Sequence, residues 1–312
     1  MIECLIRLWV HLPTLIIGEF MGKVISIKEV KKQNVVIQNP WHRLRKFTSA
    51  RIALGRSGTS VPTSELLKFQ LDHAKAMDAV HCDLDTDCLL ASLCSSCSTL
   101  QHTPEPPMVL ESEVSDRLMY LQRPDLGRRL SSKSWRELKS VKKELNQDTD
   151  LVIAIADGLS SVAIQTHAIP VVNQLLSMLS EDDEHRWNLA PIVIIKQGRV
   201  AAGDDVAECL NAKMVLLLIG ERPGLTSPDS MGMYLTWGAR RGSRDSERNC
   251  ISNVRPEGQP YEEACHRAMY LLKEARKLQL SGVGLKDRSS MDEGSPESVE
   301  DNASENFLIS SK

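Results

Sequence analysis

Three short apolar runs in the middle of the chain form its clearest pattern. They are "DLVIAIADGLS" (150–160), "APIVIIKQGRV" (190–200) and "AKMVLLLIGERPG" (212–224), and each ends in a polar loop that contains glycine. Strands that are apolar on both faces are typical of a parallel sheet covered by helices on both sides. The pattern therefore predicts an α/β fold, a Rossmann-like parallel sheet with flanking helices and right-handed crossovers.

Helical periodicity separates and follows these runs. Apolar residues at helical spacing predict a helix that spans 171–179, a short helix near 204–210, and a last helix over 262–280 that ends at Gly282. We expect these helices, the strands and the segment from 108 to 285 to form one Rossmann-like domain.

The rest of the chain divides into four segments. Residues 39–82 predict a helical N-terminal region, with one helix over 41–54 and a second that starts at 62–64. The sequence of 83–107 shows no apolar periodicity, which predicts a variable linker or insertion. Residues 286–312 predict a disordered acidic tail. Residues 1–38 are an N-terminal extension, which either forms a docking helix or precedes a true start at Met21.

Composition excludes several classes of function. The formal net charge is -3 and the aromatic content is 4%, so neither phosphate binding by clustered basic residues nor base stacking is expected, and no nucleic-acid partner is predicted. Glu3, Arg7, His11 and Pro13 interrupt the first apolar stretch, so we expect no membrane span.

The eight cysteines are scattered through a chain without a convincing secretory signal, and we expect reduced thiols in the cytoplasm. Cys94 and Cys97 form a C-x-x-C in a serine-rich run, but no second pair stands at metal-ligand spacing. We interpret this pair as a chance occurrence in a variable loop, and we predict no metal site.

The loops that follow the three apolar runs are the expected ligand site. The carboxyl ends of parallel strands meet at one sheet edge, which brings "ADGLSS", "KQGRVAAGDD" and "GERPGL" together. Glu221 and Arg222 are therefore placed to reach a polar ligand. Alternatively, Glu221 caps a neighbouring helix and Arg222 pairs with it.

Common catalytic and phosphate-binding motifs are absent from these loops. Neither G-x-G-x-x-G nor a P-loop nor G-x-S-x-G is present. We interpret Ser160 as a helix N-cap, since serine at a helix start is more often a cap than a nucleophile. His167 is expected on a helix surface. Position alone therefore indicates a ligand-binding edge without catalytic residues.

Six separate stretches follow one another along the chain: "NPWHRLRKFTSARIALGRSGT" (39–59), "YLQRPDLGRRL" (120–130), "ADGLSSVAI" (156–164), "GRV" (198–200), "IGERPGL" (219–225) and "CISNV" (250–254). Together they resemble the small subunit of ethanolamine ammonia-lyase, and the resemblance covers most of 39–284.

The resemblance implies a subunit of a two-chain lyase that depends on adenosylcobalamin. The large subunit of that family is a TIM barrel that converts ethanolamine to acetaldehyde and ammonia, and the small subunit covers the cofactor. By motif, Val200, Glu221 and Cys250 would contact the cobalamin, and no residue of this chain would be catalytic. The resemblance further implies a cytoplasmic location inside a bacterial microcompartment, with shell or lumen proteins as further partners.

Two alternatives belong to other functional classes. One is a stand-alone Rossmann-like protein that binds another nucleotide, and the other is a non-catalytic interaction protein. Within "RPDLGRRL", Arg123, Arg128 and Arg129 beside Asp125 either form a charge network at a subunit interface or lie at a solvated helix start.

Overall fold

The computed structural model describes residues 35–95, 106–144 and 148–289. The predictions for 1–34 and for the tail from 290 onward lie outside the described residues, as does Cys97 of the C-x-x-C. The chain divides into two compact units, Met1–Pro62 and Thr63–Lys312. Each unit is described by itself.

The described part of the smaller unit contains one short 3-10 helix, η1 (Pro40–Lys46). The Asn39 side chain accepts a hydrogen bond from the Trp41 N–H and begins this helix. The prediction of a longer helix over 41–54 is therefore wrong after residue 46. The backbones of Ile37 and Arg56 form an antiparallel bridge with two hydrogen bonds, 2.8 and 2.9 Å. No residue of η1 is buried, so no core packing stabilises a longer helix.

The larger unit is built on one six-stranded sheet in the order β1-β3-β2-β4-β5-β6. The first four strands of this order are parallel, whereas β5 and β6 run antiparallel to their neighbours. The three predicted strands are confirmed as β2, β3 and β4. The strands are β1 (Met108–Glu111), β2 (Thr149–Ala156), β3 (Val193–Lys196), β4 (Ala212–Gly220), β5 (Met231–Trp237) and β6 (Arg248–Val254).

The prediction of an α/β fold with a parallel sheet and flanking helices is confirmed, and β5 and β6, which the sequence did not predict, extend the sheet as antiparallel strands. The loop 221–230 returns the chain antiparallel along the edge of β4, with Gly220 paired to Met231. An antiparallel neighbour needs no crossover helix, so the sequence between β4 and β6 shows no helical pattern to mark it.

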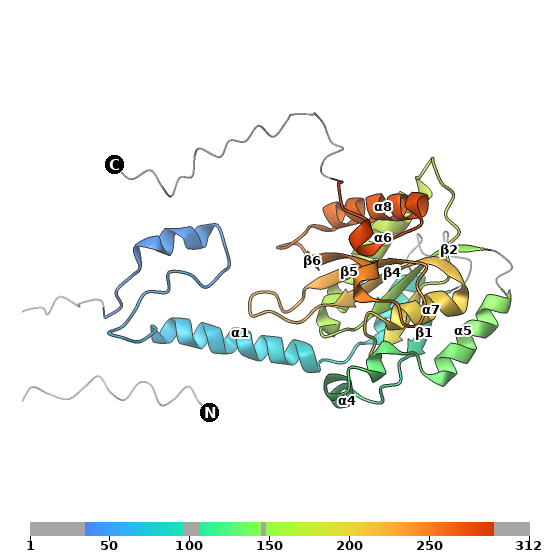
Figure 1. The fold of residues 1–312 in the computed structure, drawn as a ribbon. Coiled ribbons are helices and arrows are strands. Elements are labelled where there is room, and N and C mark those ends of the chain that lie inside the picture. The colour runs from blue at the N-terminus through green and yellow to red at the C-terminus, as the bar shows by residue number, and fades with distance from the viewer. Residues whose placement is uncertain (1–34, 96–105, 145–147, 290–312) are drawn as a thin grey trace, which may run out of the picture. The chain divides into compact units, whose positions relative to one another are not determined.

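Helices cover both faces of the sheet (Figure 1). Alternate residues of β2 show this, because Leu151, Ile153 and Ile155 belong to a cluster with α6 and α8. Val152, Ala154 and Ala156 belong to a second cluster on the opposite face, against α5 and α7. The helices are α1 (Thr63–His81), α2 (Thr86–Ser95), α4 (Arg117–Gln122), α5 (Ser132–Glu144), α6 (Ser161–Ser180), α7 (Ala202–Leu210) and α8 (Tyr261–Leu278).

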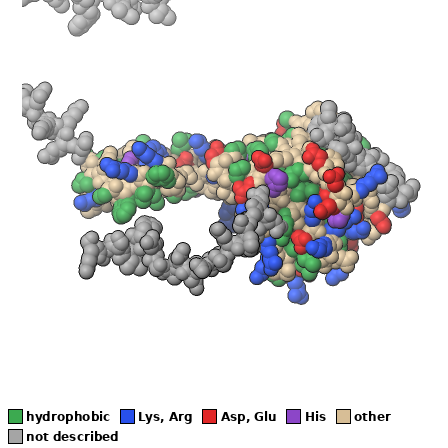
Figure 2. Space-filling model, turned by 90° about the horizontal axis from the view of Figure 1, so that it is seen from above, with side chains coloured by type: hydrophobic (Ala, Val, Ile, Leu, Met, Phe, Trp, Pro, Cys, Tyr) green, Lys and Arg blue, Asp and Glu red, His purple; other side chains and the backbone are tan. Residues whose placement is uncertain are grey.

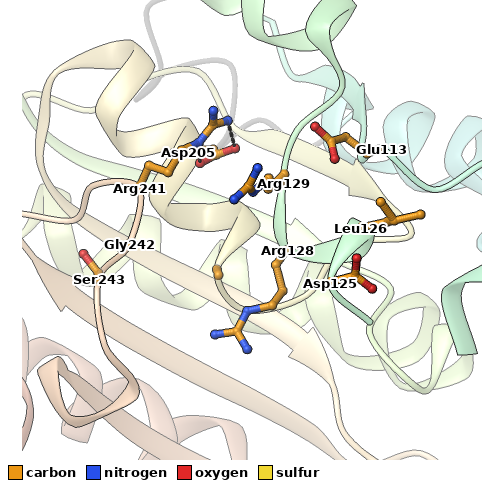
Figure 3. Close-up of a pocket in the computed structure, with 10 residues that line it drawn as sticks. Glu113, Asp125, Leu126, Arg128, Arg129, Asp205, Arg241, Gly242 and Ser243 are labelled. Carbon is orange, nitrogen blue, oxygen red and sulfur yellow. Dashed lines mark hydrogen bonds and ion pairs between the residues drawn. The ribbon is translucent and has the colours of Figure 1, made fainter. Parts of the chain in front are cut away.

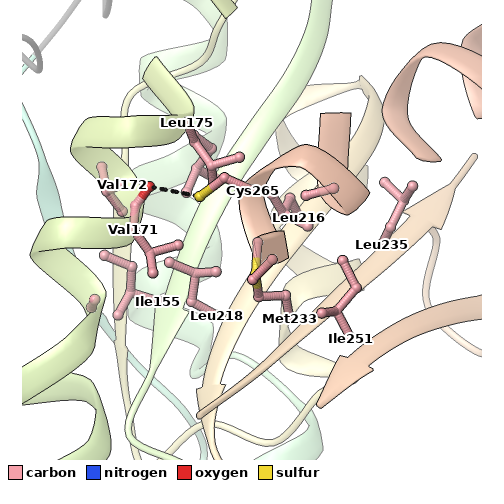
Figure 4. Close-up of a cluster of buried hydrophobic side chains, with 14 of the residues drawn as sticks. Ile155, Val171, Val172, Leu175, Leu216, Leu218, Met233, Leu235, Ile251 and Cys265 are labelled. Carbon is pink, nitrogen blue, oxygen red and sulfur yellow. Dashed lines mark hydrogen bonds between the residues drawn. The ribbon is translucent and has the colours of Figure 1, made fainter. Parts of the chain in front are cut away.

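The first cluster is the main core of the unit. Figure 4 shows side chains of α6, α8 and the sheet packed together, including Val171, Leu175 and Cys265 around Leu216 and Leu218. The apolar face that was predicted for the helix after β2 is confirmed, since residues 171, 172, 175, 176 and 179 are buried. α6 is long and apolar enough to be a membrane-span candidate, with a mean hydropathy of 1.2. Its buried side chains identify it instead as a core helix.

Two helices precede the sheet in the larger unit. α1 buries Ala76 and Ala79, whereas Leu67 and Leu71 of its expected apolar face are 59% and 56% exposed. α2 lies within the expected linker 83–107, so the loop prediction is wrong for residues 86–95. Its Leu89 and Leu93 are buried in the main core, which stabilises a helix in a serine-rich sequence. Basic and acidic side chains intermingle on the visible surface of this unit (Figure 2).

Candidate functional site

The candidate site lies where β2, β3 and β4 end. The chain leaves β2 toward α6 on one face of the sheet, and it leaves β3 toward α7 on the other face. Such a change of side opens a crevice beyond the carboxyl ends of the strands. The loops 157–160, 197–201 and 221–230 border this crevice, as the apolar runs of the sequence predict.

Asp157 joins the first two of these loops. Its carboxylate accepts hydrogen bonds from the N–H groups of Gln197 at 3.0 Å and Gly198 at 2.9 Å, and the Arg117 guanidinium lies 3.6 Å away. Burial raises the pKa of Asp157 to about 6, against the opposing effect of Arg117 and the two N–H groups. This contact fixes the backbone that carries Arg199 and Val200.

Glycines allow the first and third loops to approach closely. Gly158 has a φ of +59°, and a Cβ on Gly220 would lie 2.0 Å from the Ser160 carbonyl oxygen. The predicted N-cap is confirmed, because Ser160 Oγ accepts the Ala163 N–H at 3.2 Å. The same hydroxyl donates to the Pro228 carbonyl at 2.8 Å, which ties the start of α6 to the third loop.

Two adjoining cavities open at this edge, and together we call them the cleft. Both are lined by Arg199, Val200 and Tyr234. Cavity A has a volume of about 400 Å³ and extends to Cys250, and cavity B has about 440 Å³ and extends to Glu221. The structure therefore brings the three predicted contact residues, Val200, Glu221 and Cys250, to one cleft from three separate loops and strands.

Glu221 is held by the third loop and by β6. Its Oε2 accepts hydrogen bonds from the Ser230 hydroxyl at 2.5 Å and from the Asn253 N–H at 3.2 Å. Among the described residues, its Oε1 accepts no hydrogen bond, and no ion pair joins Glu221 to the exposed Arg222. The alternative in which Glu221 caps a helix and pairs with Arg222 is therefore wrong.

Cys250 faces Tyr234 across the β5–β6 pair. Desolvation raises the pKa of the Cys250 thiol, the Glu221 charge raises it further, and a hydrogen bond with Tyr234 opposes this shift. The thiol is therefore neutral at pH 7. A thiolate nucleophile at this position is therefore not supported.

Two arginines stack on Tyr120, which lines cavity B. The guanidinium carbons of Arg117 and Arg199 lie 4.7 and 4.2 Å from the centroid of the Tyr120 ring. The Tyr120 hydroxyl donates to the Gly198 carbonyl at 3.2 Å. Within the described part of the chain, Arg199 Nε is buried and has no hydrogen-bond partner. The sequence analysis missed Arg199, although it stands next to Val200 in "GRV".

Tyr234 was also missed, because it lies on a strand that the sequence did not predict. His167 was misplaced, since it is 2% exposed and not on a helix surface. Its Nδ1 lies 2.7 Å from the Tyr261 hydroxyl and its Nε2 lies 3.3 Å from Asp229. These partners come from distant segments, so residue spacing could not identify them. The contact fixes Asp229, the residue before Ser230.

The described residues contain no group of three or more His, Cys, Asp or Glu side chains that could hold a metal ion. Cys94 is a half-buried residue of α2. The cleft itself presents the free Oε1 of Glu221, the Arg199 side chain and the side chains of Val200 and Tyr234.

Comparisons with known proteins cover most of the chain. The family model for the ethanolamine ammonia-lyase light chain matches residues 38–286. An ethanolamine ammonia-lyase small subunit from Pseudomonas fluorescens strain Pf0-1 is 47% identical over 280 residues, which cover 90% of this chain and 98% of the relative. One from Xanthomonas campestris is 47% identical over 87% of this chain and 96% of the relative.

A further relative from Pseudomonas fluorescens strain SBW25 is 45% identical, and the match covers 91% of this chain and 99% of the relative. The matches span both units of the described chain and reach all three loops of the cleft. The chain therefore belongs to the ethanolamine ammonia-lyase small-subunit family.

Proposed function

We propose that the cleft of this small subunit binds adenosylcobalamin and covers it against a large subunit. One observation carries the proposal. Val200, Glu221 and Cys250 come from three separate motifs, and all three line two cavities that share a common wall. Family membership supports the identity of the enzyme, and the geometry of the cleft supports the proposed role of this chain as its cofactor-binding subunit.

The residues of the cleft fit the periphery of a corrin. A corrin carries neutral amide side chains, which both donate and accept hydrogen bonds, around an apolar ring. Glu221 Oε1 is an acceptor without a hydrogen-bond partner among the described residues, and the Arg199 side chain, a hydrogen-bond donor, lines both cavities. Val200 and Tyr234 supply apolar surface beside them.

The chain's own residues would bind and orient the cofactor and exclude water. Asp157 holds the loop of Val200, and Ser230 and Asn253 hold Glu221, so the contact groups are fixed before binding. When bound, adenosylcobalamin would supply the radical chemistry that ethanolamine deamination requires, which none of these side chains can supply. Substrate would bind to the large subunit.

Partner and location follow from this role. A small subunit implies a large subunit, and the finer assignment is a TIM-barrel partner whose barrel closes the open side of the cleft. We place the complex in the cytoplasm inside a bacterial microcompartment, where shell or lumen proteins would be further partners. Acetaldehyde is volatile and reactive, so its confinement would favour such a location.

The proposal is tested by filling cavity A. In a complex with the large subunit, Cys250→Trp should raise the dissociation constant for adenosylcobalamin at least tenfold, because the indole occupies space that the ligand needs. The measurement is an equilibrium absorbance titration. Val283→Trp is the matched control, since Val283 is 81% exposed and lines neither cavity.

Melting curves of both variants show whether the fold is retained. Size-exclusion chromatography shows whether each variant still assembles with the large subunit. Equal cofactor affinity in the assembled Cys250→Trp and wild-type complexes would remove cavity A from the cofactor site.

A further inference from the structure

A third cavity adjoins the cleft, and three arginines line it. This arginine pocket, of about 410 Å³, contains Arg128, Arg129 and Arg241. It shares Arg128 and Ala201 with cavity A. Figure 3 shows the Arg129 guanidinium near the Arg241–Asp205 pair, the Arg128 side chain directed away from them, and the carboxylates of Glu113 and Asp125 on the other side.

A buried carboxylate holds part of this arginine cluster in place. Asp205, which is 1% exposed, accepts hydrogen bonds from Arg241 Nε at 3.0 Å and Nη2 at 2.6 Å. It also accepts the Leu130 N–H at 3.0 Å, which fixes the backbone directly after Arg129. The Arg241 guanidinium stacks on the Trp135 ring, 4.4 Å from its centroid. The pocket is therefore organised before any ligand binds.

The charges of the pocket are unequally partnered. Asp205 is used by Arg241, and Asp125 is used by Arg123, whose two N–H groups lie 3.0 and 2.8 Å from its oxygens. The expected network of "RPDLGRRL" is thus limited to Arg123 and Asp125. Arg128 has a distant contact of 3.9 Å with the exposed Asp245.

Among the described residues, the guanidinium of Arg129 forms no hydrogen bond or ion pair. Glu113 is the single acidic side chain of the pocket without such a partner. The Arg129 guanidinium without a partner and the weakly paired Arg128 therefore line a pocket with one available carboxylate, and an anion with several oxygens would complete it. Arginine binds phosphate bidentately, and such charge-assisted hydrogen bonds are stronger than neutral ones.

We propose that the arginine pocket binds the phosphodiester of cobalamin. This inference rests on the proposed function, because it requires the corrin in the adjoining cleft. The amides around the corrin are neutral, whereas the nucleotide loop of cobalamin carries one phosphodiester with a negative charge. Arg128 borders both cavities, so a ligand that fills cavity A reaches the arginine pocket at this residue.

The test compares two ligands in the assembled two-subunit complex. Adenosylcobalamin contains the phosphodiester, and adenosylcobinamide lacks it together with the nucleotide base. Arg129→Gln should raise the dissociation constant for adenosylcobalamin about 10- to 100-fold, as expected for the loss of a hydrogen bond to a charged group. The dissociation constant for adenosylcobinamide should not change. Arg129→Lys, which keeps the charge, should recover part of the affinity.

Arg136→Gln is the matched control, since Arg136 is an exposed arginine of α5 that bonds its own helix at Ser132 and does not line the pocket. It should leave both affinities unchanged.

If Arg129→Gln weakened the binding of both ligands equally, or of neither, the phosphodiester assignment would be overturned while the proposed function stood. If it reduced assembly with the large subunit and left cofactor affinity intact, the pocket would be assigned to the partner instead. A wild-type complex that bound neither ligand would overturn the proposed function itself.

Discussion

The two carboxylate oxygens of Glu221 differ in their surroundings. One is anchored by Ser230 and Asn253, and the other is available at cavity B. The sequence analysis treated ligand binding and a structural role as alternatives, but this geometry allows one oxygen to take each role. A substitution at Glu221 is therefore expected to change both cofactor affinity and stability, in proportions that a second variant can separate.

We predict that Glu221→Gln raises the dissociation constant for adenosylcobalamin about tenfold in the assembled complex, because a charged acceptor becomes a neutral one. The melting temperature should fall by a few degrees at most, since the amide keeps one acceptor oxygen. Cofactor titration and a melting curve measure the two effects.

Ser230→Ala is the control for anchoring, because it removes the hydroxyl bond and keeps the charge. It should lower the melting temperature with a smaller effect on affinity. If the two variants lost affinity equally, Glu221 would act through loop anchoring and not by contact with the ligand.

The residues of the cleft were predictable to different degrees. Val200, Glu221 and Cys250 stand in short motifs, so a sequence comparison finds them. Arg199 and Tyr120 interact through stacking between segments 79 positions apart, which no local pattern records. His167 differs again, because its partners Tyr261 and Asp229 make burial of a polar ring favourable, and neither is near it in sequence.

At the scale of elements, the sequence predicted those strands whose two faces are both buried. β2 and β4 are continuous apolar runs because helices cover both of their faces. β5 and β6 lie at one edge of the sheet, with polar and half-exposed positions such as Tyr234 and Asn249. Their sequences "MGMYLTW" and "RNCISNV" match neither the buried-strand nor the helical pattern, so pairing with β4 decides their structure.

The close approach of the first and third loops gives a prediction about the end of β4. Gly220→Ala should lower the free energy of unfolding by about 3 kcal/mol or more, because the new Cβ would meet backbone oxygens of Ser160 and Asp157 at 2.0 and 2.5 Å. Backbone atoms cannot move aside without separating the two strand ends. Urea denaturation of the purified chain measures the change.

Gly203→Ala is the matched control for this substitution. Gly203 lies in α7, and its Cβ would make ordinary contacts at 3.5 Å or more. Alanine has the higher helix propensity, so this variant should be neutral or more stable by up to about 1 kcal/mol. Equal stabilities of the two variants would contradict the tight packing of the first and third loops.

At the scale of the whole molecule, the proposed function gives this chain one half of a binding site. The cleft is formed by one sheet edge and its loops, and the described residues contain no group of three or more His, Cys, Asp or Glu side chains that could hold a metal ion. Exposed apolar residues on α1, such as Leu67 and Leu71, provide further surface for a partner. A ligand the size of adenosylcobalamin would leave much of its surface uncovered in this cleft.

We therefore predict that the purified chain alone produces no acetaldehyde from ethanolamine and binds adenosylcobalamin weakly. Half of the cofactor's surroundings and the whole substrate site would belong to the large subunit, so neither binding nor turnover can be complete without it. Acetaldehyde is measured by coupled reduction with alcohol dehydrogenase and NADH. Mixing with a separately purified large subunit should restore turnover and tighten cofactor binding in the same titration.

The Cys250→Trp chain provides the control, since it should assemble but restore less activity at limiting cofactor. Turnover by the small subunit alone would show that this chain contains a complete active site, contrary to the half-site that its cleft indicates.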